Sequence, residues 1–289
     1  GPGADPVKEQ FGLGDIQALI IDIDGTLLRG PLPMPGLFEL FAFLRSRQVS
    51  FVVVSNNATK TPTQYRTKLA DLGVEVEVEN ILTAATATAA YLRRELRQDA
   101  ALYIIGERAL EEVFRRAGFV LLGDASQLAE AVVVGGDSTL TYDKLKHAVL
   151  LLQRGARLVG TNPDLLCPTE EGLVPEAGTT LAALQAATGV APTVVGKPAR
   201  YLFDVAMERM GSTPARTAVL GDRLETDILG GQGAGLKTVL VTTGVDNERT
   251  MRQKGIEPDL VVSGLHEVIE IWEKQSKHLN HEEAADDNP

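Results

Sequence analysis

Short apolar runs rich in β-branched residues alternate along the chain with longer segments that carry apolar residues at helical spacing. The runs "QALIIDID" (17–24) and "SFVVVSN" (50–56) predict strands, because each is a nearly continuous apolar stretch. The segments 36–48 and 61–73 predict helices, and Pro62 stands near the start of the second. Apolar strands separated by helices indicate a parallel sheet that is covered on both faces.

Two further sets of strands follow the same pattern. In the last third of the chain, we predict strands at 193–197, 217–222, 237–244 and 259–264. The middle of the chain has its own set, with strands predicted at 101–106, 131–136 and 157–161. This middle set is large enough for a small α/β domain.

The order of these sets predicts the domain organisation. We expect an α/β fold with a doubly wound, Rossmann-like parallel-sheet core and an inserted smaller α/β domain. Residues 1–84 and 191–275 would form the core, with the last-third strands completing its sheet, and residues 85–190 would form the insertion. Residues 276–289 are polar and acidic, and we expect them to be a disordered tail.

Composition narrows the function classes. A net charge of −11 over 289 residues argues against nucleic acid or an anionic membrane as the main partner. The sequence has no apolar run of the roughly 18 residues that a membrane span needs, and no secretory signal is expected at the N-terminus. A single cysteine, Cys167, excludes an intrachain disulfide and favours a cytoplasmic location.

Polar residues gather where the predicted core strands end. The residues in question are Asp22 and Asp24, then Ser55, Asn56 and Asn57, then Lys197, and last Asp222 with Asp227. Alternation along a strand would point the carboxylates of Asp22 and Asp24 the same way. Ligands of doubly wound sheets bind beyond the carboxyl ends of the strands. We therefore expect one pocket lined by carboxylates, a lysine and a hydroxyl.

Each of these features also has a plain structural interpretation. "DIDGT" could be a strand that ends in an Asp-Gly turn. The residues Ser55 to Asn57 could cap the next helix, and Asp222 and Asp227 could be acidic residues at a helix N-terminus. The order of all four groups at strand ends favours the functional interpretation.

Such a pocket suits phosphoryl transfer through an acyl-phosphate. Asp22 would be the nucleophile, and Mg²⁺ held by Asp22, Asp222 and the main-chain carbonyl of Asp24 would relieve the repulsion between carboxylates. Lys197 and the Ser55 hydroxyl would hold the phosphoryl oxygens. Main-chain N–H groups around Gly25 and Asn56 would join them, while Asp227 and Asn57 support the site. Pro198 suits the first turn of a helix that begins after the lysine.

These motifs resemble those of the haloacid dehalogenase superfamily. "DIDGT", "SNN", "GKP" and "GDRLETD" are similar to its four motifs and occur in the same order. The insertion between the second and third motifs resembles the subgroup with a large α/β cap, which contains phosphoglycolate, pyridoxal phosphate, nucleotide and 4-nitrophenyl phosphate phosphatases.

The resemblance implies a Mg²⁺-dependent phosphomonoesterase with Asp22 as nucleophile and Asp24 as general acid/base. It also implies that a small phosphorylated metabolite is the substrate and that the cap selects its leaving group. A homodimer or a higher homo-oligomer could form through the cap. A phosphatase must protonate its leaving group whereas a dehalogenase need not, so Asp24 favours phosphatase. Glu176 departs from the pattern, because relatives often have a small residue there.

Some alternatives stay open. A phospho-accepting receiver domain would be about half this length and would not need Asp24. A binding protein without activity would be expected to have lost one of the key residues, and none is lost. A phosphotransferase or mutase differs only in how well the closed cap excludes water. In the insertion, Asn162 and Asp164 are candidates for substrate contact, although Asn-Pro-Asp is equally typical of a turn.

Overall fold

The computed structural model describes residues 12–286 of the chain. The chain divides into two compact units, each built on its own parallel sheet. Unit 1 comprises the chain up to Val54, Arg66–Ile81, and the chain from Ala206 onwards, and unit 2 comprises Ser55–Tyr65 and Leu82–Val205.

Unit 1 contains the larger sheet, whose strand order is β15-β14-β13-β1-β4-β5. The strands are β1 (Ala18–Asp22), β4 (Ser50–Ser55), β5 (Ile81–Thr83), β13 (Thr217–Gly221), β14 (Lys237–Val241) and β15 (Leu260–Val262). Every residue of β1 and of β13 is buried, as expected for central strands that helices cover on both faces. The parallel pairing of β1 with both β13 and β4 brings the carboxyl ends of the three strands to one edge.

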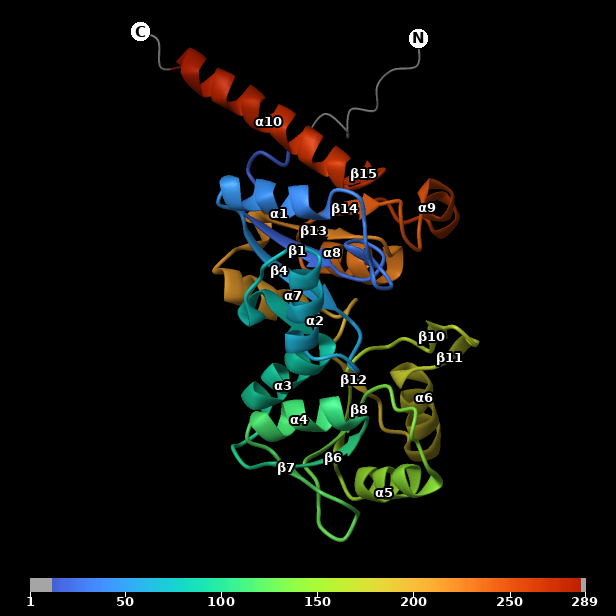
Figure 1. Cartoon of the computed structure of the whole chain (residues 1–289). Coiled ribbons are helices and arrows are strands. Elements are labelled where there is room, and N and C mark those ends of the chain that lie inside the picture. Colours follow the sequence, from blue (N-terminus) through green and yellow to red (C-terminus); the bar gives the residue numbers. More distant parts are fainter. Residues whose placement is uncertain (1–11, 287–289) are drawn as a thin grey trace. The chain divides into compact units, whose positions relative to one another are not determined.

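Helices cover both faces of this sheet. On one face, Phe41 of α1 (Leu37–Ser46) packs edge-on against Phe51 of β4, and α1 also contacts α10 (Leu265–Asp286) (Figure 1). In α8 (Leu229–Gly233), a side chain at Gly231 would meet Val219 of β13. In the sheet, Leu19 lies beside Phe51, and the next residue, Ile20, lies beside Val219. Successive residues of a strand point to opposite faces, so Phe51 and Val219 face opposite sides of the sheet, and so do the helices α1 and α8 that contact them. The remaining helices of the sheet's connections are α2 (Pro62–Asp71), η1 (Val78–Asn80), α7 (Arg200–Met210), η2 (Pro214–Arg216), η3 (Leu224–Ile228) and α9 (Glu248–Lys254).

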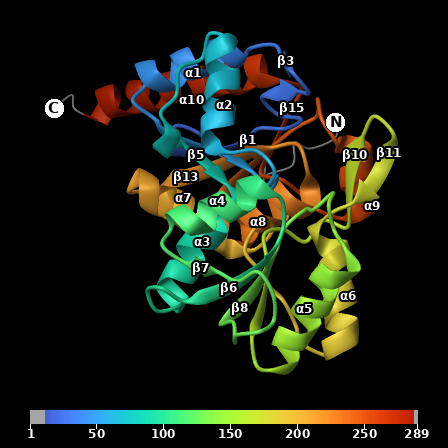
Figure 2. The same ribbon diagram turned by 60° about the horizontal axis from the view of Figure 1, so that its bottom comes forward.

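Unit 2 contains the second parallel sheet, in the order β12-β9-β8-β6-β7. Its strands are β6 (Ala101–Ile105), β7 (Val120–Leu121), β8 (Ala131–Val134), β9 (Arg157–Gly160) and β12 (Thr193–Val194). Its helices are α3 (Ala84–Glu95), α4 (Arg108–Arg116), α5 (Tyr142–Gln153) and α6 (Ala177–Thr188). Helices α5 and α6 pack together on one side of the sheet, and α3 and α4 pack on the other (Figure 2). Two hairpins complete the described elements: β2 (Leu28–Arg29) with β3 (Leu32–Pro33), and β10 (Leu166–Thr169) with β11 (Gly172–Pro175).

The α/β fold with parallel sheets is confirmed, but one strand belongs to a different sheet from the one predicted. We expected the strand that precedes Lys197 to complete the core sheet. Instead β12 pairs with β9, with Thr193 opposite Val159, so it is an edge strand of the sheet in unit 2. A run of apolar residues indicates a strand, but it contains no information about which sheet the strand joins.

Two local expectations also change. Pro198 lies in a turn before α7, with a cis peptide bond to Lys197, and so it is not in the first turn of that helix. We expected a disordered tail from residue 276, but helix α10 continues through Asp286. The segment is rich in good helix formers such as Glu and Ala, which favours the helix. Residues 287–289 lie outside the described residues, as do residues 1–11, where we expected no secretory signal. Within 12–286, no helix is both long and apolar enough to span a membrane.

Candidate active site

The nucleophile candidate stands at the carboxyl end of a central strand. Asp22 is the last residue of β1 and is 6% exposed. Ile21 pairs with Leu220 of β13, so β1 and β13 end side by side, and Asp222 follows directly after β13. Asp222 is fully buried. The register of these two strands therefore places two buried carboxylates at one edge of the sheet.

A third carboxylate reaches the same point from a turn of π-helix. Asp227 lies in η3, which begins two residues after Asp222. Its Oδ2 accepts a hydrogen bond from the backbone N–H of Arg223 at 3.1 Å, which fixes the carboxylate over the start of that turn. Asp227 is also fully buried. Wider π-helical turns are often found at functional sites, because they shift a side chain relative to the regular helix.

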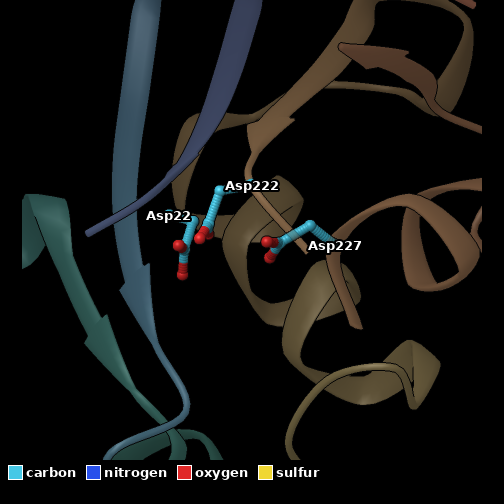
Figure 3. Close-up of side chains that lie close together, drawn as sticks. All are labelled: Asp22, Asp222 and Asp227. Carbon is cyan, nitrogen blue, oxygen red and sulfur yellow. The ribbon is translucent and has the colours of Figure 1, made fainter. Parts of the chain in front are cut away.

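The three aspartates form one cluster, and their carboxylates turn toward one another (Figure 3). A carboxylate oxygen from each of Asp22, Asp222 and Asp227 lies within 4.8 Å of those of the other two. Three like charges this close repel one another, and a divalent cation between them would relieve that repulsion. Carboxylate oxygens are hard ligands of the kind that Mg²⁺ and similar ions prefer. The donor set therefore fits a hard divalent cation.

Glycines leave the space that the Asp222 carboxylate occupies. A Cβ added at Gly25, or one added at Gly244, would overlap the Asp222 side chain. Gly25 also has a φ of +86°, a left-handed conformation that favours glycine. The backbone can thus approach the acidic cluster closely, as a phosphate-binding or metal-binding loop requires. Gly25 was predicted to lie at this site, whereas no motif of the sequence pointed to Gly244.

Asp24 differs from Asp22 in burial and in backbone setting, and the expectation that the two carboxylates point the same way stays a prediction. Strand β1 ends at Asp22, and Asp24 lies beyond it in an isolated bridge with Leu28. Asp24 is exposed, whereas Asp22 is buried, and its carboxylate is outside the acidic cluster. The chain turns at Gly25, whose N–H donates to the carbonyl of Leu28 at 2.8 Å, so the strand geometry behind the prediction does not extend that far.

Sequence reasoning missed Thr26. Its side chain is fully buried, and its hydroxyl lies 3.4 Å from Asp22 Oδ2 and 3.4 Å from Asp222 Oδ1. It therefore bridges two of the three clustered carboxylates. The available signal was its place in "DIDGT", directly after the turn at Gly25.

A second group of predicted residues lies in unit 2. Lys197 is 2% exposed, and the side-chain amide of Asn56 holds its backbone in both directions. Asn56 Nδ2 donates to the Lys197 carbonyl at 2.9 Å, and the Lys197 N–H donates to Asn56 Oδ1 at 2.9 Å. Ser55 is buried at the end of β4, and its Oγ lies 3.0 Å from the hydroxyl of Tyr65. The second and third motifs are thus held together by one asparagine side chain.

The remaining candidates in unit 2 stabilise turns. Asn57 Oδ1 accepts from the N–H and the hydroxyl of Thr59, at 2.8 and 2.6 Å. Asn162 is buried, and its Oδ1 accepts from the N–H of Asp164 at 3.1 Å, which is the turn interpretation of Asn-Pro-Asp. Asn162 Nδ2 donates to the carbonyl of Asn56 at 3.0 Å. Asn162 thereby supports the asparagine that holds Lys197.

Glu176 is the N-cap of α6. Its Oε1 accepts from the N–H of Ala177 at 3.0 Å. Burial raises the pKa of this carboxyl, the hydrogen bond from Ala177 lowers it, and nearby acidic groups such as Asp164 raise it again, with a net upward shift. Glu176, which stands where relatives often have a small residue, is therefore a partly desolvated carboxyl at the N-terminus of α6.

Comparison with known proteins gives a consistent result over most of the chain. The family model described as "Haloacid dehalogenase-like hydrolase" matches residues 19–120, and the model described as "HAD-hydrolase-like" matches residues 194–268. An acid sugar phosphatase from Staphylococcus aureus is 34% identical over 258 residues, which cover 89% of this chain and 98% of the relative.

Solved structures agree with this match. A p-nitrophenyl phosphatase from Archaeoglobus fulgidus superposes with a TM-score of 0.84 at 33% identity, covering 89% of this chain and 99% of its own. A 4-nitrophenylphosphatase from Thermotoga maritima also gives a TM-score of 0.84, at 34% identity, covering 89% of this chain and 98% of its own.

Proposed function

This chain belongs to the haloacid dehalogenase-like hydrolases and is a phosphatase, and from this premise we propose that it hydrolyses small phosphomonoesters, with Mg²⁺, through an aspartyl-phosphate on Asp22. The observation that carries the proposal is the position of Asp22: a buried carboxylate at the end of a central strand, clustered with Asp222 and Asp227. A nucleophile that forms a covalent intermediate divides one difficult displacement into two easier steps.

The residues that hold Mg²⁺ in this proposal are the clustered aspartates and the main-chain carbonyl of Asp24. Asp227, predicted only as a supporting residue, joins Asp22 and Asp222 on the evidence of their clustered oxygens. When bound, the ion would neutralise carboxylate charge and allow a phosphate dianion to enter an acidic protein. The hydroxyl of Thr26 would hold the Asp22 and Asp222 carboxylates in place from the protein side.

The proposed reaction has two steps. In the first, a carboxylate oxygen of Asp22 attacks phosphorus, the ester P–O bond breaks, and Asp24 gives a proton to the departing alcohol oxygen. In the second, Asp24 takes a proton from water, the water oxygen attacks phosphorus, and the acyl-phosphate bond breaks to release phosphate and the free Asp22 carboxylate. The exposure of Asp24 supports this role, because an exposed carboxyl can exchange protons with alcohol and water.

Lys197 and Ser55 are the proposed ligands of the phosphoryl oxygens. An ammonium group stabilises the charge that these oxygens carry in the transition state, and a hydroxyl can donate to one of them. The double hydrogen bond from Asn56 to the Lys197 backbone supports this role, because a charge that stabilises a transition state must be held in place beforehand. Tyr65, whose hydroxyl lies beside Ser55 Oγ, would orient the serine.

Sugar phosphates are the substrate class that we propose. The support is that the relatives described above include an acid sugar phosphatase, a p-nitrophenyl phosphatase and a 4-nitrophenylphosphatase. The residues 85–190 act in this proposal as a cap that selects the leaving group, as predicted from the sequence. Asn162 would shape a cap loop, because its side-chain oxygen accepts from the Asp164 N–H, and Asp164 remains the proposed cap residue for contact with the substrate.

Phosphate release from 4-nitrophenyl phosphate and from a panel of sugar phosphates tests the proposed function. We expect turnover with Mg²⁺, loss of turnover in excess chelator, and recovery when Mg²⁺ is restored, because clustered carboxylates repel the substrate dianion without a cation. The matched protein control is Asp222→Asn, which should lower Mg²⁺ affinity and activity together. Full activity in excess chelator would refute the metal site, and release from 4-nitrophenyl phosphate alone would refute the substrate class.

A further inference from the structure

The loop that carries a buried aspartate, Asp246, outside the acidic cluster makes three hydrogen bonds to Asp222 and to the turn that follows it. Asp246 lies in the loop between β14 and α9, and its side chain is 1% exposed. Its backbone N–H donates to the carbonyl of Asp222 at 3.0 Å. The preceding N–H, that of Val245, donates to Asp222 Oδ2 at 2.9 Å. One loop therefore binds both the backbone and the carboxylate of Asp222.

The Asp246 side chain also holds the turn that carries the third clustered carboxylate. Its Oδ2 accepts from the backbone N–H of Leu224 at 2.7 Å, and Leu224 is the first residue of the π-helical turn η3. That N–H lies at a helix start, where it has no partner within the turn itself. Asp246 thus fixes the backbone between Asp222 and Asp227, on which the spacing of their carboxylates depends.

A lysine completes the arrangement. Lys254, the last residue of α9, places its ammonium 2.9 Å from Asp246 Oδ1 and 2.7 Å from the more exposed Glu225 of η3. The same ammonium therefore neutralises the buried aspartate and ties α9 to the π-helical turn. The Lys254 side chain is 34% exposed, so the pair is half-buried, and removal of the lysine would leave the buried Asp246 carboxylate without its cation.

We infer that Asp246 is a positioning residue, which with Lys254 fixes Asp222 and Asp227 in the spacing that binds the metal ion. The inference rests on the proposed function, because it assumes that the acidic cluster holds Mg²⁺. Asp246 does not touch the substrate; it acts through Asp222 and η3. Partners of metal ligands typically change metal affinity by about 10-fold to 100-fold when they are removed.

Unit 2 supplies a matched control. Asp137 is also 1% exposed in its side chain, pairs with Lys144 at 2.6 Å, and accepts a backbone N–H from Thr139 at 2.9 Å. Its exposure and its partners are therefore close to those of Asp246, but its hydrogen bonds and its ion pair are made to Thr139 and Lys144, within unit 2. Loss of stability alone should affect Asp137→Ala and Asp246→Ala alike.

The test is calorimetric titration of the full chain with Mg²⁺ alone, together with the thermal stability of each variant. We expect Asp246→Ala to weaken Mg²⁺ binding by at least about 10-fold, and Asp246→Asn to weaken it less, because an asparagine oxygen can still accept from Leu224. Asp137→Ala should bind Mg²⁺ as the unmodified protein does. In kinetics with Asp246→Ala, saturating Mg²⁺ should restore most of kcat.

Each outcome decides the matter. If Asp246→Ala does not fold, Lys254→Met and Asp246→Asn serve in its place, and the inference is wrong if both bind Mg²⁺ within about twofold of the unmodified protein. It is also wrong if Asp246→Ala and Asp137→Ala weaken binding equally. If the unmodified protein itself binds no Mg²⁺, the proposed function fails first, and the inference with it.

Discussion

At the scale of the residue, two aspartates separated by one position have different environments. Asp22 is buried among carboxylates at the end of β1, while Asp24 is exposed beyond the end of the strand. Buried clustered charge suits a nucleophile that works beside a cation, and an exposed carboxyl suits proton exchange. The division of labour that we propose for the two aspartates therefore matches their difference in burial.

Replacing Asp24 should affect substrates according to their leaving groups. General acid catalysis contributes about 10²-fold to 10⁴-fold, and Asp24→Asn should cost that much with a sugar phosphate, whose alkoxide needs a proton. With 4-nitrophenyl phosphate the cost should be smaller, because the phenolate leaves without one. The measurement is kcat/KM for both substrates, with the exposed Asp71→Asn as control. An equal loss on the two substrates would show that Asp24 does not protonate the leaving group.

Individual site residues were predictable where their position along the chain determines their position in space. Asp22 and Asp222 follow apolar runs, and the ends of parallel strands meet at one edge. Thr26 and Asp246 were not predictable, because their contacts with Asp222 join positions 196 and 24 residues apart through side-chain or loop geometry. No periodicity encodes such a contact.

At the scale of the element, a two-residue strand and a single π-helical turn determine where two of the predicted site motifs lie. The strand β12 has two residues and joins the sheet of unit 2 through β9, so the lysine motif follows a different sheet from the other motifs. The π-helical turn η3 brings Asp227 to the cluster, and a sequence pattern with helical spacing predicts a regular helix there. Long apolar strands and amphipathic helices were predicted from their periods, whereas two-residue strands and single wide turns have no period to detect.

The N-cap of helix α6, Glu176, allows a prediction of how the stability of the protein depends on pH. The pKa of Glu176 is raised in the folded state above its unfolded value, chiefly by burial, so ionisation at neutral pH opposes folding. The stability that the protonated Glu176 side chain contributes is fully present below the pKa of this group in the unfolded chain. It is lost as the pH rises through the pKa of the same group in the folded protein. Glu176→Gln keeps an oxygen for the Ala177 N–H and removes the charge. It should be more stable than the unmodified protein at about pH 7 and equal to it at about pH 4.

Urea unfolding at the two pH values measures this difference. The exposed Glu171→Gln is the control, and it should follow the unmodified protein at both pH values. A Glu176→Gln protein that is less stable at neutral pH would contradict the account, because it would mean that the carboxylate stabilises α6 more than burial penalises it.

At the scale of the whole molecule, the chain passes between two units several times. Unit 1 contains the clustered aspartates, and unit 2 contains Ser55, Asn56 and Lys197. The sequence predicted two α/β regions from separate sets of apolar strands, and the structure has two parallel sheets. Excision of residues 85–190 would remove β9, the neighbour of β12, so such a protein would lose support for Lys197 as well as any selectivity of a cap.

The central claim is that the phosphoryl group is transferred to Asp22. The direct measurement is mass spectrometry of peptides from protein quenched in acid during turnover of 4-nitrophenyl phosphate, with Asp24→Asn used to slow hydrolysis of the intermediate. We predict one phosphoryl group on the peptide that contains Asp22, and none on the Asp22→Asn protein. Phosphate found on Ser55 instead, or steady turnover with no phosphorylated peptide in either protein, would contradict the account.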